Sequence, residues 1–163
     1  MAKDTRTGLE NSIDSVQDEY DIVKALIKAS EYKEDDIFKT KISVKRGGEV
    51  LFSFCIRPLS DDEIYEASTA ATSFIPNPTN PKLPKIRNSV DEARYGSALI
   101  YFATTDEDRA RVWDNKETLD ALGLRDPLDL IDVVLTANDK KKIVNTINSS
   151  GAAEIEVEEV IKN

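Results

Sequence analysis

Apolar residues recur every three or four positions near the start of the chain, which is the spacing of one face of an α-helix. This recurrence predicts an amphipathic helix over about 11–32, with an apolar stripe that comprises Leu9, Ile13, Val16, Tyr20, Val23 and Ile27. The stripe is shorter than the roughly three heptads that a coiled coil needs. Two interpretations stay open: the helix packs on its own domain, or it docks on a partner or a second copy.

From residue 37 the pattern changes to strict alternation, which is typical of β-strands with one buried face. It predicts an antiparallel hairpin over 37–57 that turns at Gly47 and Gly48. A two-residue loop would place the apolar residues of the two strands on opposite faces. We therefore expect a three-residue loop, 46–48, with a glycine at positive φ. That register pairs Lys45 with Glu49, Val44 with Val50, Ile42 with Phe52 and Thr40 with Phe54.

Helix signals dominate between residues 60 and 150. Ser60 followed by three acidic residues is a capping box, which predicts a helix from Asp61 to about Thr72. A helix that is apolar nearly all round, and therefore central, is expected after an N-cap at Asn88 or Ser89. Further helices are predicted over 116–122 with a stop at Gly123, from Pro127 behind the cap Asp126, and over a last segment that closes at 149–151.

Four prolines lie close together between Pro76 and Pro84. Proline lacks a backbone donor and fixes φ, so we expect 74–84 to be a loop without regular structure. Taken together, the elements predict an α+β fold: a mainly helical domain with one N-terminal antiparallel β-hairpin. We expect a single domain over 11–151, a disordered N-terminus over 1–10 and a flexible acidic tail over 152–163.

The composition argues against an enzyme. The 163 residues include no histidine, which removes the usual general base at neutral pH and the nucleophile pairs that depend on imidazole. The single cysteine, Cys55, cannot form an internal disulfide or complete a zinc site. The acidic pairs, such as Asp61-Asp62, fall at expected helix starts and turns, where the helix dipole and solubility explain them. We expect no catalytic residue, no metal and no cofactor.

The net charge of −9 indicates the kind of partner. An acidic protein repels phosphate backbones and anionic lipid, so we expect neither nucleic acid nor a membrane surface as a partner. No stretch has the length of a membrane span, and residues 1–9 lack the apolar run of a signal peptide. We therefore expect a cytoplasmic protein that binds other proteins. Trp113, the lone tryptophan, is either an interface anchor or a core residue.

Three segments, in this order and spacing, resemble the XkdN-like tail assembly chaperones of long-tailed phages and prophages: Phe54-Cys55-Ile56-Arg57-Pro58-Leu59-Ser60, Tyr95 to Ile100 leading to Ala103-Thr104, and Asp126 to Leu130 continuing through Leu135 to Ile143 and Ile147. The resemblance covers about 50–151. It implies a non-catalytic protein of the host bacterial cytoplasm that binds the tape measure protein, helps recruit tail tube subunits and is absent from the mature virion. It also implies self-association into a homo-oligomer and a longer, frameshifted product.

Two other functions are considered. One is an acidic phage-encoded inhibitor that mimics DNA, although lysines are interspersed with the acids in most segments. The other is a structural tail or connector component. For a protein-binding role, the candidate contact residues are Leu9, Ile13, Val16, Tyr20, Val23, Ile27 and Trp113.

Overall fold

A computed structural model describes residues 21–31 and 39–150 of the chain. The chain divides into two compact units at Phe38 and Lys39, and each unit is described by itself. In the first unit, residues 21–31 form a helix, within the predicted range. The expected disordered and flexible ends lie outside the described residues, as do the candidate contact residues Leu9, Ile13, Val16 and Tyr20.

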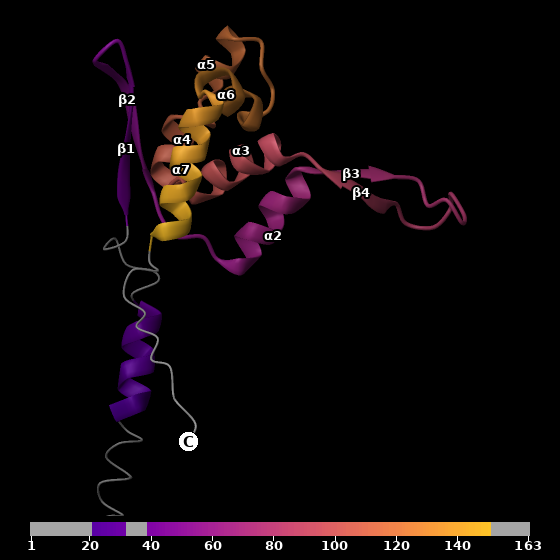
Figure 1. The fold of residues 1–163 in the computed structure, drawn as a ribbon, viewed down its shortest axis with the longest axis horizontal. Coiled ribbons are helices and arrows are strands. Elements are labelled where there is room, and N and C mark those ends of the chain that lie inside the picture. The colour runs from indigo at the N-terminus through magenta and orange to yellow at the C-terminus, as the bar shows by residue number, and fades with distance from the viewer. Residues whose placement is uncertain (1–20, 32–38, 151–163) are drawn as a thin grey trace, which may run out of the picture. The chain divides into compact units, whose positions relative to one another are not determined.

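Within residues 39–150 the chain forms two hairpins and six helices (Figure 1). In chain order these are β1 (Thr40–Arg46), β2 (Glu49–Ile56), α2 (Asp61–Ala70), β3 (Thr72–Ile75), β4 (Ile86–Val90), α3 (Glu92–Ala103), α4 (Asp106–Arg111), α5 (Lys116–Ala121), α6 (Pro127–Val134) and α7 (Ala137–Ser149). The predicted α+β class with a mainly helical body is therefore confirmed. The expectation of one hairpin is wrong, because β3 and β4 form a second one.

The loop of the first hairpin differs from the prediction. Arg46 pairs with Glu49, so the turn contains two residues, Gly47 and Gly48, with φ of 57° and 83°. The expected positive φ is confirmed, whereas the three-residue loop is wrong. The register shifts beyond Lys45, and Leu51 is left without a partner, so that Val44 then faces Phe52 and Ile42 faces Phe54. This bulge brings the apolar residues of both strands onto one face despite the tight turn.

The second hairpin occupies part of the segment that was expected to lack regular structure. Residues 74–75 belong to β3, and the four prolines lie in the loop between the strands, where they remove no ladder hydrogen bond. The predicted N-caps Asn88 and Ser89 are also wrong, because both lie in β4. Asp91 caps α3 instead, and its side chain accepts a hydrogen bond from the backbone N–H of Arg94.

Other predicted helix boundaries are confirmed. Ser60 and Glu63 form the capping box of α2, and Asp126 caps α6 with Pro127 at its first position. Gly123 follows α5 with a φ of 68°, as expected for a residue that ends a helix. The last helix begins behind Thr136, whose side chain and Asp139 form a second capping box.

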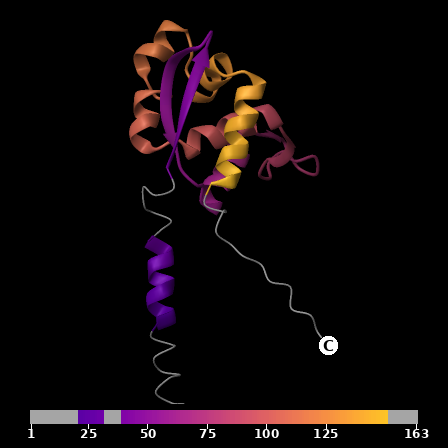
Figure 2. The ribbon, with the colours of Figure 1, turned by 60° about the vertical axis from the view of Figure 1, so that its left-hand side comes forward.

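The predicted central helix is α3. Its residues Ala98, Ile100 and Ala103 have no exposed surface, and α2, α6 and α7 all pack against it. The views in Figures 1 and 2 place the β1–β2 hairpin beside α7, and an ion pair between Arg46 and Asp139 joins them at 2.6 Å.

Trp113 belongs to this core. Its side chain is fully buried and packs edge-on against the rings of Phe52 and Phe54, with centroid distances of 5.9 and 5.2 Å. Its indole Nε1–H donates to Thr104 Oγ1 at 3.0 Å. Of the two roles considered for this residue, the structure therefore places it as a core residue that offers no surface to a partner.

The replacement Trp113→Phe tests this role. The variant loses the indole donor and part of the ring volume in a closed site, so we expect the free energy of unfolding to fall by about 1–3 kcal/mol. Urea unfolding followed by circular dichroism measures the change, since the chain has no other tryptophan. The exposed aromatic Tyr65 provides a control, because Tyr65→Phe should leave the stability unchanged. Equal stability of both variants would contradict a core role for Trp113.

Candidate protein-binding groove

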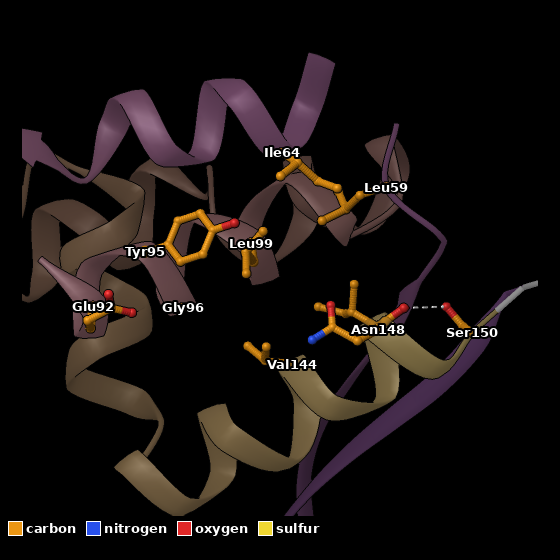
Figure 3. Close-up of a pocket in the computed structure, with 10 residues that line it drawn as sticks. Leu59, Ile64, Glu92, Tyr95, Gly96, Leu99, Val144, Asn148 and Ser150 are labelled. Atoms are coloured by element: carbon orange, nitrogen blue, oxygen red, sulfur yellow. Dashed lines mark hydrogen bonds between the residues drawn. The ribbon is translucent and has the colours of Figure 1, made fainter. Parts of the chain in front are cut away.

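A groove of about 440 Å³ with a mixed polar and apolar lining lies between α2, α3 and α7. Figure 3 shows the side chains of α7 facing those of α2 and α3 across the open space. Its apolar lining comprises Leu59, Ile64, Tyr95, Leu99, Val144 and Ile147. Glu92, Asn148 and Ser150 add polar groups to the lining. A groove of this size accommodates a few apolar side chains rather than a whole helix.

Gly96 forms part of the groove, in the middle of α3. A Cβ atom at this position would meet Val144 Cγ2 at 4.0 Å, which is an ordinary van der Waals distance. Gly96 is not among the glycines with positive φ, so an alanine would fit the helix. A glycine inside a helix costs about 0.5–1 kcal/mol relative to alanine. The packing of the described residues therefore does not require this glycine, and its effect is to keep the groove open.

The α2 side of the groove is fixed by an ion pair at the end of β2. Arg57 donates to both carboxylate oxygens of Glu63, at 2.9 and 2.8 Å. Glu63 also accepts from the backbone N–H of Ser60 at 3.1 Å, which completes the capping box. Because Leu59 and Ile64 flank these residues, the ion pair and the cap together hold them at the groove.

The same contacts perturb the acid–base behaviour of this pair. Burial raises the pKa of Glu63, but the hydrogen bonds from Arg57 and Ser60 outweigh it, so the pKa lies below its usual value. The hydrogen bond to Glu63 raises the pKa of Arg57, against the effect of burial. The pair is therefore ionised throughout the neutral range and acts as a structural clamp.

A second polar cluster holds α6 and α7 against α3. Arg94 of α3 pairs with Asp126 and, at 2.9 Å, with Asp129. Lys140 of α7 contacts Asp132 of α6 at 2.8 Å and donates to Ser97 Oγ of α3 at 3.1 Å. These contacts connect three helices at the N-terminal end of α7, so the α7 wall of the groove is fixed relative to its α3 floor.

The helix at residues 21–31 presents a separate apolar surface. Ile22, Val23, Leu26 and Ile27 are each between 52% and 62% exposed. Val23 and Ile27 are two of the predicted contact residues. Ile22 and Leu26 were missed because they fall outside the regular three-and-four spacing of the stripe. A helix of this length is marginal in water unless its apolar face is covered.

Sequence reasoning also missed the groove. Its lining comes from the β2–α2 connection, α2, α3 and α7, which are far apart in the chain. One local signal existed: Gly96 lies two positions before the apolar run that begins at Ala98, in a predicted central helix, where glycine is unfavourable. None of the described helices is long and apolar enough to cross a membrane. Among the described residues, no group of three or more potential ligands could hold a metal ion.

The clamp between Arg57 and Glu63 gives a pH-dependent prediction. Because the folded-state pKa of Glu63 is lowered, its ionised form stabilises the fold above the unfolded pKa of about 4.3, and this contribution is lost as the pH falls through the folded value. We expect Glu63→Gln to reduce the free energy of unfolding by about 1 kcal/mol at pH 7, a figure that allows for partial solvent exposure.

Urea unfolding measured at several pH values tests this expectation. The difference between wild type and Glu63→Gln should shrink as the pH is lowered from about 5 to about 3. Glu117→Gln, at an exposed acid in the first turn of α5, is the matched control and should have little effect. A difference that stays constant over this pH range would show that the charge of Glu63 is not what stabilises α2.

Comparison with known protein families gives a match over most of the chain. The family model described as phage XkdN-like tail assembly chaperone protein matches residues 23–163, which is most of the chain and includes every residue of the groove. No curated protein and no solved structure matches the chain.

Proposed function

Because the chain belongs to the XkdN-like phage tail assembly chaperone family, we propose that it binds the tape measure protein and helps recruit tail tube subunits during tail assembly. The family is one of assembly chaperones, so the chain is not an enzyme. We place the site of action in the host bacterial cytoplasm, with the chaperone leaving before the tail is complete. The resemblance of the three sequence segments supports this assignment.

The groove at Gly96 is the observation that carries the proposal. An amphipathic helix binds to a groove by inserting apolar side chains spaced three and four residues apart. The α2–α3–α7 groove offers apolar side chains in its lining for such contacts, and the missing side chain at Gly96 leaves room in it for a side chain of the client. A tape measure helix inserted in this way would have part of its apolar face shielded from water, which keeps it soluble.

The alternative of a DNA mimic receives less support. Such a protein needs a row of unpaired carboxylates that imitates a phosphate backbone. The exposed acids of α2 cover a single helix of ten residues, whereas in α6 Asp129 pairs with Arg94 and Asp132 pairs with Lys140. A structural tail component is distinguished from a chaperone by its presence in purified phage particles, where we expect this chain to be absent.

Co-expression with the tape measure protein tests the groove. We expect the wild-type chain to increase the soluble fraction of the tape measure protein and to co-purify with it. Gly96→Leu fills the groove without a change of charge and should reduce the co-purified amount by roughly tenfold, which corresponds to about 1.4 kcal/mol of binding. Ala121→Leu adds the same side chain at an exposed position of α5 and is the matched control.

Gly96→Ala separates folding from binding. The free chain should become more stable by about 0.5–1 kcal/mol in urea unfolding, because alanine favours the helix and has room at this position. Its affinity for the tape measure protein should nevertheless fall, with Gly96→Leu weaker still. Wild-type recovery with Gly96→Leu would show that the groove does not bind the client.

We propose the apolar stripe of the helix at 21–31 as a second protein-binding surface. Val23→Glu with Ile27→Glu places two charges in the stripe, and Ala25→Glu with Ala29→Glu places two on the opposite face of the same helix. We expect the first pair to reduce recovery of the tape measure protein at least about fivefold, or about 1 kcal/mol. The second pair should leave recovery unchanged. Equal recovery with both pairs would contradict a role for the stripe.

A further inference from the structure

The second hairpin forms an arm, which we define as residues 72–90. Figure 1 shows β3 and β4 extending away from the helices that surround α3. The arm is a two-stranded ribbon, and such ribbons are marginally stable in water unless another element covers them. Its exposed apolar side chains are Phe74, Ile75, Leu83, Ile86 and Val90, each between 38% and 47% exposed. This is a concentration of apolar surface that suits a contact with another molecule.

The charge of the arm is opposite to that of the rest of the chain. Residues 72–90 contain Lys82, Lys85 and Arg87 and no acidic residue. The remaining residues carry 19 basic and 31 acidic side chains, so their net charge is −12. Among the described residues, neither Lys82 nor Lys85 has a carboxylate partner, and both are exposed. The arm therefore favours an acidic partner surface.

The chain itself provides such a surface on α2. This helix contains four acidic residues and no basic one. Glu63 is engaged by Arg57, but Asp61, Asp62 and Glu66 are exposed, and the neighbouring ring of Tyr65 is exposed as well. The dimensions also agree, because a helix of ten residues is about 15 Å long and a strand of five residues spans about 16 Å.

Within one chain, the arm contacts the C-terminal half of α2, close to the point where β3 follows that helix. Arg87 lies over the ring of Tyr65, with its Cζ atom 5.6 Å from the ring centroid, and contacts Thr69 Oγ1 at 3.4 Å. Arg87 is thus used to fix the arm to its own α2. Lys82 and Lys85, in the loop towards the tip, are left for a contact outside the chain.

We propose that two copies of this chain form a dimer in which the arm of each copy binds the acidic face of α2 in the other. A single residue, Ala71, separates α2 from β3, so a two-fold axis near this junction lays each arm antiparallel to the partner α2. The contact is then formed twice, which is the self-complementary arrangement that closed dimers require. It pairs Lys82 and Lys85 with Asp62 and Glu66 and covers the apolar residues of both arms.

A charge swap tests this dimer. Variant A carries Lys82→Glu and Lys85→Glu in the arm, and variant B carries Asp62→Lys and Glu66→Lys in α2. Each variant alone opposes like charges in both contacts, so we expect its dimer dissociation constant to rise at least about tenfold, to a largely monomeric state. In an equimolar mixture both contacts again join opposite charges, and a dimer of A with B should form.

Size-exclusion chromatography with light scattering measures the mass of each sample, and higher salt should weaken the wild-type dimer. Arg125→Glu with Lys141→Glu changes the net charge as variant A does, at exposed positions outside the arm, and should remain dimeric. A monomeric wild type, a dimeric variant A, or a mixture that fails to associate would each overturn the proposal. The chain is measured alone, so this result is independent of binding to the tape measure protein.

Discussion

Burial of α3 is the constraint on which the second unit depends. Ala98, Ile100 and Ala103 have no exposed surface, and α2, α6 and α7 pack around them. Ion pairs join α7 to the first hairpin, α6 to α3, and α2 to Arg57 directly after β2, and these contacts fix the helices around the groove. The groove lies beside Gly96 of α3, in the space between α2 and α7. A preformed groove lowers the entropic cost of binding a client helix.

How much of the fold could be predicted depended on whether the signal was local. The capping box at Ser60 and the Asp126-Pro127 start are decided by a few adjacent residues, and both were confirmed. The hairpin turn at Gly47 and Gly48 was confirmed as well, but the length of its loop was not, since the register depends on a bulge at Leu51 beyond the turn itself. In the second hairpin the prolines do mark a loop, but strands of four and five residues fit on either side of it.

The candidate site was less predictable than the fold. The apolar stripe of the first helix is a periodic signal, and its described members Val23 and Ile27 are exposed. A groove between α2, α3 and α7 depends on packing between residues about 30–90 positions apart, which periodicity cannot reveal. Trp113 was also not predictable from the sequence, because composition does not distinguish a lone tryptophan in the core from one at an interface. Its packing against Phe52 and Phe54 identifies it as a core residue.

Site-specific photo-crosslinking from the groove tests client binding most directly. A photoreactive residue at Asn148, an exposed position that lines the groove, would be compared during co-expression with one at Val133, an exposed position of α6 outside it. Binding of the tape measure protein in the groove predicts a covalent adduct from position 148 and little or none from position 133. An adduct from position 133 without one from position 148 would contradict it.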